Sequence, residues 1–526
     1  MKALVPPGNW PSVRRAAPAA TLPGAWAAQW AARPSSVVLT DGRDPARPAT
    51  GAQMSERTAS LAAVLTRHGA GPGTRVLWSA RATPESVDAL LAVLTAGATL
   101  VPLNPAATPA EIAHVVEDAE PTVAVTDRTD AADVFGPGVV ALSVDDLTTT
   151  TSRATFAPPP LGADDDALIV YTSGTTGRPK GIRRPLSGAD PEAAVAPMVT
   201  VVSQIMGVPT GEGVQLVTGP MYHATPGSLA TLGLHMGHTL VLMDKWEPQR
   251  ALELVERYRV SYMHMVPTMF QRLLALPEEV KRSYDTSSLR CVVHGAAPCP
   301  KDVKMRMIDW FGPIINEYYG SSEGGGASVG AEDWLKRPGT VGLPWPGAAI
   351  RIYDENGWEC PPNQAGEVYI KMPGFEFEYH NAPEKTRDST RDGFFTVGDV
   401  GYLDEDGYLF LSGRSTELII SGGVNIYPAE IEGYLAAHPA VADVGVIGVP
   451  NQEWGEEVKA VVQLREGVEP SAELADELIA HCRDGLAGYK VPRSVDFREA
   501  LPRTETGKLY KRLLREEYWA SAGRQL

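Results

Sequence analysis

The stretch Asp166-Ala-Leu-Ile-Val-Tyr171-Thr-Ser-Gly-Thr-Thr-Gly-Arg-Pro-Lys180-Gly181 carries the strongest structural signal in this sequence. It begins with an apolar run of strand length and continues as a loop rich in glycine, serine and threonine. Three glycines let the backbone approach a bulky anion and adopt positive φ values: Gly174, Gly177 and Gly181. Four side chains supply donors that suit phosphate oxygens: Ser173, Thr175, Thr176 and Lys180. The stretch therefore predicts a buried strand that leads into a phosphate-binding loop.

The loop differs from a Walker A motif, in which Gly-Lys-Ser/Thr follows four spacer residues. Here Gly177 is followed by Arg-Pro-Lys-Gly. The alternative interpretation is a glycine-rich surface loop that binds nothing. Eleven consecutive residues of this chemistry, Tyr171 to Gly181, come directly after a buried strand and favour phosphate binding over that alternative.

Strand and helix patterns alternate on both sides of this loop. Residues 74–80 predict a strand, residues 84–97 a helix that opens with Pro-Glu, and residues 99–103 the next strand. The β-α-β order predicts a parallel sheet. The same alternation continues beyond, with strands expected at 166–171, 214–218, 239–243, 289–293 and 314–318 and helices at 248–258 and 268–276.

The pattern changes near residue 414. Short hairpin-like strands are expected before it, at 366–371, 401–403 and 408–412. The tail after residue 417 has the size of a single domain, with strands expected at 440–449 and 458–466 and a helix at 471–483. We therefore expect an α/β chain in which a large N-terminal domain, residues 1–414, is joined through residues 415–417 to a small C-terminal domain, residues 418–526.

Composition and charge narrow the classes of function. The chain has 526 residues and a formal net charge of −17 at pH 7, which argues against a nucleic-acid partner because such binding depends on Lys and Arg contacts with phosphate. The longest apolar stretch, residues 89–103, is too short and too interrupted to span a bilayer. Arg14 and Arg15 are followed by two prolines and a glycine, which disfavours an export signal. The four cysteines form no CxxC pair, so neither disulfides nor zinc are expected. We expect a cytoplasmic protein.

Further segments carry residues that suit a nucleotide. Small residues in His294-Gly-Ala-Ala-Pro298 leave a slot for a flat base at the end of a strand. Tyr318-Tyr-Gly-Ser-Ser-Glu323 combines aromatic faces with the hydroxyl of Ser322 and with a carboxylate that suits Mg²⁺. Asp399 can accept hydrogen bonds from both hydroxyls of a ribose. Lys508, in Pro502-Arg-Thr-Glu-Thr-Gly-Lys508, follows a turn that lets its ammonium reach a distant site.

The loop at 171–181 resembles the signature loop of the ANL superfamily of adenylate-forming enzymes, which includes acyl- and aryl-CoA synthetases, luciferases and peptide-synthetase adenylation domains. The other segments follow in the order typical of that superfamily, from about residue 25. The resemblance implies parallel and mixed sheets with helices and a small β-barrel-like part in the large domain, a hinge at 415–417, and a mobile α+β C-terminal domain. It also implies the reaction of an AMP-forming acyl-CoA synthetase. ATP activates a carboxylic acid as an acyl-adenylate, and coenzyme A then accepts the acyl group with release of AMP.

The resemblance also assigns roles to single residues. For catalysis it implies Lys508, Glu323, Ser322 and His223, with Glu323 as the Mg²⁺ ligand. For the phosphates of ATP it implies Thr172, Ser173, Gly174, Thr175, Thr176, Gly177 and Lys180. For adenine and ribose it implies Gly295, Ala296, Ala297, Tyr318, Tyr319, Gly320, Asp399 and Arg414, and for coenzyme A the turn Gly422-Gly423. His223 is expected at the acyl or thiol entrance, as a gate or as a general base.

Two positions depart from the pattern of the superfamily. Ser322 stands where threonine is usual and keeps the hydroxyl, whereas Thr416 stands at the expected pivot in place of Asp or Lys. Because Thr416 is β-branched and stiff, an alternative stays open. The adenylate then passes to a carrier protein or an amine, or serves nitrite-type diazotisation of an amino-aryl acid. The expected partner is a small-molecule carboxylic acid, whether fatty, aryl or sterol, and a homodimer is left open.

Overall fold

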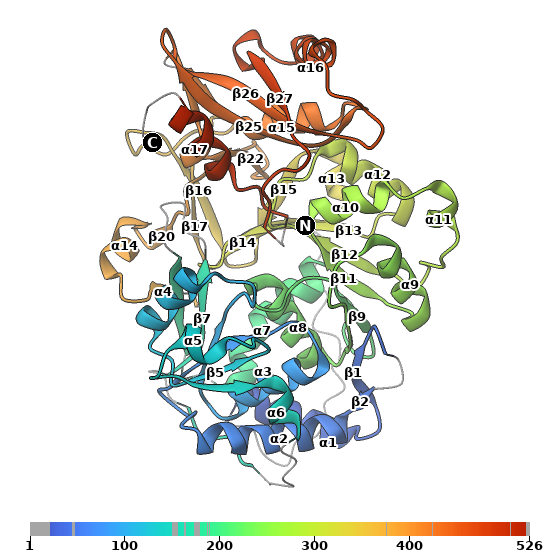
Figure 1. Cartoon of the computed structure of the whole chain (residues 1–526), viewed down its shortest axis with the longest axis vertical. Helices are drawn as coiled ribbons and strands as arrows, with labels where there is room; N and C mark the ends of the chain where they lie inside the picture. Colours follow the sequence, from blue (N-terminus) through green and yellow to red (C-terminus); the bar gives the residue numbers. More distant parts are fainter. Residues whose placement is uncertain are drawn as a thin grey trace. The chain divides into compact units, whose positions relative to one another are not determined.

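The computed structural model of this chain (Figure 1) describes residues 21–44, 48–149, 156–161, 165–172, 179–186, 188, 190–374, 376–422, 424–504 and 507–521. The chain folds into two compact units. Unit 1 is Met1–Thr200 with Thr210–Asp244 and Phe377–Asn381, and unit 2 is Val201–Pro209 with Lys245–Glu376 and Ala382–Leu526. This division differs from the boundary expected at residue 414, which remains a prediction. Arg14 and Arg15 lie outside the described residues.

The central sheet of unit 1 has the strand order β18-β8-β7-β4-β3-β5-β6. Its parallel strands are β3 (Arg75–Ser79), β4 (Thr99–Pro102), β5 (Val123–Thr126), β6 (Val140–Ser143) and β7 (Asp166–Thr172). Two antiparallel strands extend it, β8 (Lys180–Pro185) and β18 (Glu378–Tyr379). The predicted strand–helix–strand unit at 74–103 is confirmed, because β3 and β4 flank α3 (Pro84–Thr95) and pair in parallel.

Local signals fix the ends of α3. The side chain of Thr83 accepts a hydrogen bond from the Ser86 backbone N–H, and Ser86 returns one to the Thr83 backbone, so that a capping box closes the first turn. Pro84 occupies the first turn, where no N–H is required. The helix ends at Thr95, two residues before the predicted end, because Gly97 takes a positive φ of 76°.

A second group of strands in unit 1 has the order β9-β10-β1-β2: β9 (Val214–Val217), β10 (Thr239–Leu242), β1 (Val37–Asp41) and the antiparallel β2 (Ala49–Thr50). The other helices of unit 1 are α1 (Leu22–Ala32), α2 (Gly51–Arg67), α4 (Pro109–Ala119), α5 (Ala131–Phe135), α6 (Val144–Thr149), α7 (Pro191–Thr200) and α8 (Ala224–Met236). Trp26, Trp30, Met54 and Trp78 are buried together in the largest apolar cluster of this unit.

Unit 2 begins with three parallel strands, β11 (Tyr262–Met265), β12 (Cys291–His294) and β13 (Ile315–Gly320). β12 starts two residues later than predicted, because Leu289 still belongs to a turn in which its N–H lies 3.0 Å from the carbonyl oxygen of Thr286. The helices around these strands are α9 (Pro248–Tyr258), α10 (Pro267–Leu274), α11 (Glu278–Arg282), α12 (Lys301–Phe311), α13 (Ala331–Lys336) and the π-helix η1 (Val201–Ile205).

Antiparallel strands follow in the region expected to resemble a small barrel: β14 (Gly326–Val329), β15 (Thr340–Pro344), β16 (Ala349–Tyr353), β17 (Gly366–Lys371), β19 (Thr390–Arg391), β20 (Phe394–Phe395), β21 (Asp399–Leu403) and β22 (Leu409–Arg414). Their order continues from β13 as β14-β15-β22-β21-β17-β20-β19, with β16 also beside β17. α14 (Pro383–Asp388) precedes β19. The expected hinge at 415–417 is the 3-10 turn η2 (Ser415–Glu417).

The C-terminal part, coloured orange to red in Figure 1, has its own sheet with the order β24-β23-β26-β25. Its strands are β23 (Ile419–Ser421), β24 (Val424–Ile426), β25 (Val441–Asn451), β26 (Gly455–Leu464) and β27 (Ser494–Phe497), and β27 runs parallel to β26. Its helices are α15 (Pro428–Ala436), α16 (Ala472–Gly485), the 3-10 turn η3 (Gly488–Lys490) and α17 (Lys511–Ser521). This is the small α+β domain that the sequence predicts. Across the described ranges of the whole chain, no helix combines the length and the apolar character needed to cross a membrane.

Candidate active site

The predicted phosphate loop connects two paired strands of unit 1. Thr172, the last residue of β7, is paired with Lys180, the first residue of β8. Ser173, Gly174, Thr175, Thr176 and Gly177 lie outside the described residues. Lys180 and Thr172 are therefore placed next to each other at the two ends of the loop. The Lys180 ammonium lies 4.9 Å from the centroid of the Tyr379 ring, which is a cation–π distance.

α4 anchors both ends of this loop. The hydroxyl of Tyr171 donates to Asp118 at 2.6 Å, and the Nε2 atom of His114 lies 2.9 Å from the carbonyl oxygen of Pro179. A Cβ atom at Gly181 would lie 3.1 Å from the side chains of His380, Ile169 and Tyr171, so a larger residue there would press on all three side chains.

His223 is the predicted entrance residue, and it precedes α8 in unit 1. Its ring centroid lies 4.4 Å from that of Tyr222, which is itself buried. Burial lowers the pKa of His223 to about 4, so the imidazole is neutral near pH 7. A neutral, largely buried imidazole fits a gate or a pocket wall.

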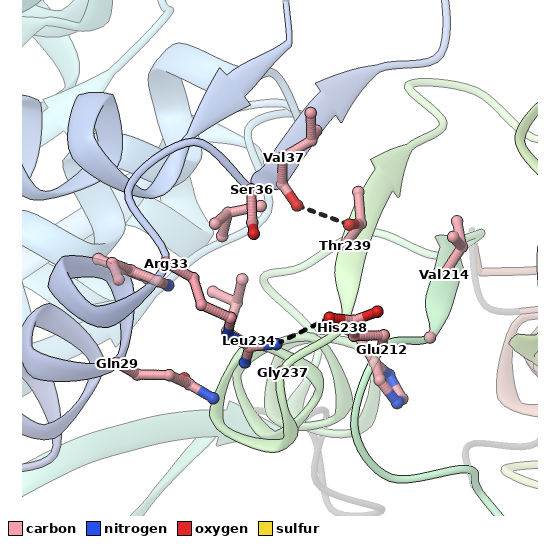
Figure 2. A pocket seen from close by; sticks show the side chains of 13 residues that line it. Gln29, Arg33, Ser36, Val37, Glu212, Val214, Leu234, Gly237, His238 and Thr239 are labelled. Atoms are coloured by element: carbon pink, nitrogen blue, oxygen red, sulfur yellow. Dashed lines mark hydrogen bonds and ion pairs between the residues drawn. The ribbon is translucent and has the colours of Figure 1, made fainter. Parts of the chain in front are cut away.

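Unit 1 also contains a cavity of about 300 Å³ beside α1, β1 and β10 (Figure 2). Arg33 and Glu212 face each other across it at 3.7 Å, and the hydroxyl of Thr239 donates to the carbonyl oxygen of Val37 at 2.6 Å (Figure 2). None of the described candidate site residues lines this cavity. It is therefore separate from the site that the sequence predicts.

The predicted adenine loop in unit 2 follows the end of β12. A Cβ atom at Gly295 would lie 2.5 Å from Cε1 of the Tyr318 ring, so only glycine fits there. Ala296 adopts a left-handed φ of 67°, which is uncommon for a residue other than glycine. Ala297 completes the loop, which lies against Tyr318. The hydroxyl of Tyr318 lies 3.2 Å from Nε2 of His264.

Tyr319, Asp399 and Arg414 form a connected group. The Tyr319 hydroxyl donates to one oxygen of Asp399 at 2.7 Å, and Nε of Arg414 donates to the other at 2.9 Å. Burial, and then the charge of Asp399, raise the pKa of Tyr319, so the phenol keeps its proton. A carboxylate has about four lone-pair sites, so Asp399 retains acceptor capacity for ribose hydroxyls. The sequence identified all three residues, but the bonds among them are a finding of the structure.

The predicted magnesium ligand, Glu323, follows β13 in the same part of unit 2. Its side chain is buried, and its charge contributes to the raised pKa of Tyr319. Gly320, at the end of β13, lies under the Trp345 ring, where a Cβ atom would be 3.5 Å from the ring edge. No cluster of three or more acidic, His or Cys side chains suits a metal within the described parts of the chain. A single carboxylate matches the usual habit of Mg²⁺ at nucleotides, which is to take one or two carboxylates and the substrate phosphates.

Lys508, the predicted catalytic lysine, lies in the electrostatic environment of this group. Burial lowers the pKa of its ammonium, Arg414 lowers it further, and the charges of Glu417 and Asp399 oppose the shift. Tyr319, Asp399, Arg414 and Lys508 all belong to unit 2, whereas His223, which is also predicted for catalysis, belongs to unit 1.

The turn that carries Lys508 is held from both sides. The Lys508 N–H donates to the hydroxyl of Thr504 at 2.9 Å, and the Thr504 N–H donates to the Lys508 carbonyl at 2.8 Å. Arg503 binds both oxygens of Asp443, at 2.5 and 2.6 Å. Sequence reasoning quoted Arg503 only as part of a motif and missed Asp443, which stands alone in β25 without a local signal. Glu505 and Thr506 lie outside the described residues.

The predicted glycine turn for coenzyme A is only partly described, because Gly423 lies outside the described residues. Gly422 has a φ of 58°, and a Cβ atom there would lie 2.5 Å from the Trp454 ring. Its N–H donates to the Trp454 carbonyl at 2.8 Å. Packing against Trp454 therefore already requires glycine at this position.

Two family models and several known proteins match this chain over most of its length. A family model described as AMP-binding enzyme matches residues 26–380, and one described as AMP-binding enzyme C-terminal domain matches residues 430–508. A feruloyl-CoA synthase from Amycolatopsis sp is 36% identical over 478 residues, which cover 89% of this chain and 94% of that protein. A long-chain-fatty-acid–CoA ligase from Bacillus subtilis is 32% identical over 511 residues, which cover 87% of this chain and 88% of that protein. The crystal structure of ATP-bound MatB from Rhodopseudomonas palustris matches with a TM-score of 0.82 at 31% identity, covering 95% and 99%.

Proposed function

The chain belongs to the AMP-binding enzymes, in the branch of the AMP-forming acid–CoA ligases, and we propose that it activates a monocarboxylic acid with an apolar or aromatic body. ATP and coenzyme A are the co-substrates of this branch. The observation that supports the proposal for the site is the hydrogen-bonded group of Tyr319, Asp399 and Arg414, in which Asp399 keeps acceptor capacity for ribose hydroxyls.

The first half-reaction needs no side-chain nucleophile. A carboxylate oxygen of the acid attacks the α-phosphorus of ATP, the bond to pyrophosphate breaks, and an acyl-adenylate forms. In the second half-reaction the thiolate of coenzyme A attacks the acyl carbon and AMP leaves. Catalysis of the first step therefore rests on positioning and on stabilisation of charge.

The residues of this chain divide these tasks. Asp399, oriented by Tyr319 and Arg414, accepts the ribose hydroxyls. Lys508 binds the substrate carboxylate and the α-phosphate, and Lys180 with the loop hydroxyls binds the outer phosphates. Glu323 would hold Mg²⁺, which would supply neutralisation of the triphosphate charge.

The side chains on and before α8 support a substrate that carries one carboxylate and no second charged group. α8 has the sequence ATPGSLATLGLHM, which offers no Lys or Arg to a second carboxylate. His223 before it is kept neutral by burial. Of the predicted pocket walls, Tyr222, Leu232 and Met236 are buried, and His235 in the last turn of α8 is half-buried. Such a surface favours an aryl or aliphatic body over a dicarboxylic acid.

A pyrophosphate-release screen tests the substrate class. Benzoic, cinnamic, fatty and sterol acids are compared with malonic and 2-succinylbenzoic acids in the presence of ATP and Mg²⁺, and thioesters are then measured by mass spectrometry after addition of coenzyme A. We expect turnover of monocarboxylic acids and formation of their thioesters. Turnover of the dicarboxylic acids alone contradicts the proposed class.

Replacement of the lysine tests the site. Lys508→Met should lower acyl-adenylate formation by about 10²- to 10³-fold, the usual loss for one preorganised electrostatic contact. Binding of ATP should be largely kept. Lys385→Met, an exposed lysine of α14 in the same unit, is the matched control and should act like the wild type. Unchanged adenylation by Lys508→Met rejects the catalytic assignment.

A second candidate function keeps the adenylate and changes the acceptor. Thr416 lies in the turn η2, and its carbonyl oxygen accepts a hydrogen bond from Arg515 of α17 at 3.3 Å. Thr416 is β-branched and its carbonyl oxygen is held by Arg515, so this pivot is stiff. A stiff pivot favours the domain arrangement that forms the adenylate over the arrangement that admits the thiol of coenzyme A. Pyrophosphate release without a thioester for any active acid favours this candidate, and a carrier protein or an amine is then the acceptor to test.

A further inference from the structure

A buried ion pair connects α12 with β13 in unit 2. The ammonium of Lys304 donates to Glu317 at 2.6 Å, and the exposed fractions of the two side chains are 0% and 8%. The same ammonium lies 4.6 Å from the centroid of the Trp334 ring on α13. Burial lowers the pKa of Lys304 and raises that of Glu317, and each partner opposes the shift of the other.

Stability alone gives little reason for such a pair. Removing both charges from water is costly, and apolar residues of similar volume are often equally stabilising or better. The proposed reaction does not use either side chain chemically. The position of the ion pair in the fold therefore indicates its role.

The pair lies directly behind the predicted adenine site. Glu317 is the residue before Tyr318, and His294 is the residue before Gly295. Glu317 and His294 are partners across the parallel strands β13 and β12. Nε2 of His294 lies 3.6 Å from the same Glu317 oxygen that binds Lys304. β12 ends at His294 whereas β13 continues to Gly320, so the ion pair of Lys304 lies where the pairing of the two strands ends.

The residues that follow this last pair along both strands tolerate little movement. Gly295 has no room for a Cβ atom against the Tyr318 ring. Ala296 keeps a left-handed φ of 67°, a conformation that persists only when the surrounding structure imposes it. Backbone pairing of β12 and β13 ends at His294 and Glu317, and the contact of Glu317 with Lys304 adds a directional side-chain restraint at that pair.

We propose that Lys304 and Glu317 are positioning residues for the nucleotide, because their buried ion pair restrains the last paired position of β12 and β13 and with it the adjoining Gly295–Ala297 loop and Tyr318. This inference rests on the proposed function, since the adenine role of that loop is part of it. Neither residue touches the reacting atoms. Their effect is on the affinity for the nucleotide.

The experiment compares three variants of the full chain. Lys304→Met leaves Glu317 buried without its partner. The double variant Lys304→Met with Glu317→Met replaces both charges by apolar side chains. Lys301→Met makes the same chemical change at an exposed position of the same helix and is the matched control. Thermal unfolding, the KM for ATP and kcat in pyrophosphate release, and the Kd of AMP by calorimetry are measured for each.

We expect Lys304→Met to lower Tm and to raise the KM for ATP and the Kd of AMP about tenfold, with kcat at saturating ATP changed less than about twofold. The double variant should recover Tm, because no unpaired charge remains. Its KM for ATP and Kd of AMP should stay raised, because the directional contact is still absent. Lys301→Met should match the wild type.

Recovery of nucleotide affinity together with Tm in the double variant overturns the proposal, because the pair would then serve stability only. Should Lys304→Met fail to fold, the double variant carries the test by itself. Binding of AMP by the wild type distinguishes a failure of this proposal from a failure of the proposed function on which it rests. A wild type that does not bind AMP contradicts the proposed function, whereas a wild type and a double variant that bind AMP equally contradict only the positioning role.

Discussion

Gly507, the residue before Lys508, offers the sharpest test of the catalytic loop. Its φ is 78°, in the left-handed region. A Cβ atom there would fall inside the contact distance of the Thr268 hydroxyl and 3.0 Å from Cγ2 of Thr268, in the first turn of α10. Gly507→Ala therefore meets two separate obstacles, one in its own backbone and one in α10.

The size of the effect follows from these two terms. Alanine in the left-handed region costs about 1–2 kcal/mol, and overpacking of a close contact costs about 1–3 kcal/mol. Together the two costs correspond to a roughly 30-fold or larger loss in the rate of adenylation, because about 1.4 kcal/mol equals a factor of ten. The loop relieves both terms by moving away from α10, which takes Lys508 with it. The largest expected loss of adenylation rate is therefore the one caused by removing Lys508, about 10³-fold.

The assay separates the two half-reactions. We expect Gly507→Ala to lower pyrophosphate release by about 30- to 10³-fold and to leave thioester formation from a supplied acyl-adenylate unchanged. Gly433→Ala is the matched control, because Gly433 lies in α15 with no atom within 4 Å of an added Cβ. It should behave like the wild type in both assays.

A second substitution tests the cause of the loss. Thr268→Ala removes the hydroxyl and Cγ2 and leaves its Cβ 3.2 Å from the added methyl group. Combined with Gly507→Ala, it should restore about 5- to 100-fold of the lost rate, because only the backbone term remains. Near-normal adenylation by Gly507→Ala, or no recovery in the double variant, refutes the reasoning.

Three further predictions concern the nucleotide group and its surroundings. Asp399→Asn should raise the KM for ATP about 10-fold or more, because it removes a charged hydrogen-bond partner. Tyr319→Phe removes a single hydrogen bond and should raise the KM for ATP less than about 10-fold. Initial rates measure both values. Glu323→Gln should raise the Mg²⁺ concentration needed for half-maximal adenylation, which a Mg²⁺ titration at fixed ATP measures, and an unchanged midpoint excludes Glu323 as the ligand. Burial lowers the pKa of His264 from 6.5 to about 4, so the unfolded chain binds its proton first as the pH falls. Stability attributable to His264 is then present above pH 6.5 and lost towards pH 4 by about 1.4 kcal/mol per pH unit, and urea unfolding of His264→Gln should show a correspondingly smaller slope over this range.

Elements with strong local signals could be predicted closely from the sequence. α9 was expected at 248–258 and spans Pro248–Tyr258, because Glu247 caps its first turn and Arg259 ends it in a left-handed conformation. β17 likewise spans the predicted residues 366–371. Boundaries shifted where a turn competes with a strand, as at Leu289 before β12. The resemblance of the signature loop predicted the family correctly, because its glycine, hydroxyl and lysine pattern is local.

The roles of several glycines could not be read from the sequence. Gly181 and Gly422 were predicted to let a ligand approach, and the structure adds that their Cβ atoms would lie 3.1 Å from His380 and 2.5 Å from Trp454, which come from distant segments. A local pattern shows that a residue is small. It does not show which part of the chain lies against it.

By itself, the sequence determined the family and the order of many strands and helices, and it indicated the loop at 171–181, Asp399, Arg414 and Lys508 as candidates for the site, because periodicity, capping and motif chemistry are encoded in neighbouring residues. Only the tertiary structure decided that Asp399 binds Tyr319 and Arg414, that Gly507 lies against Thr268, and that Lys304 pairs with Glu317. These contacts join segments far apart along the chain. They exist because packing of strands and helices closes long loops, and no short-range pattern records which segments then meet.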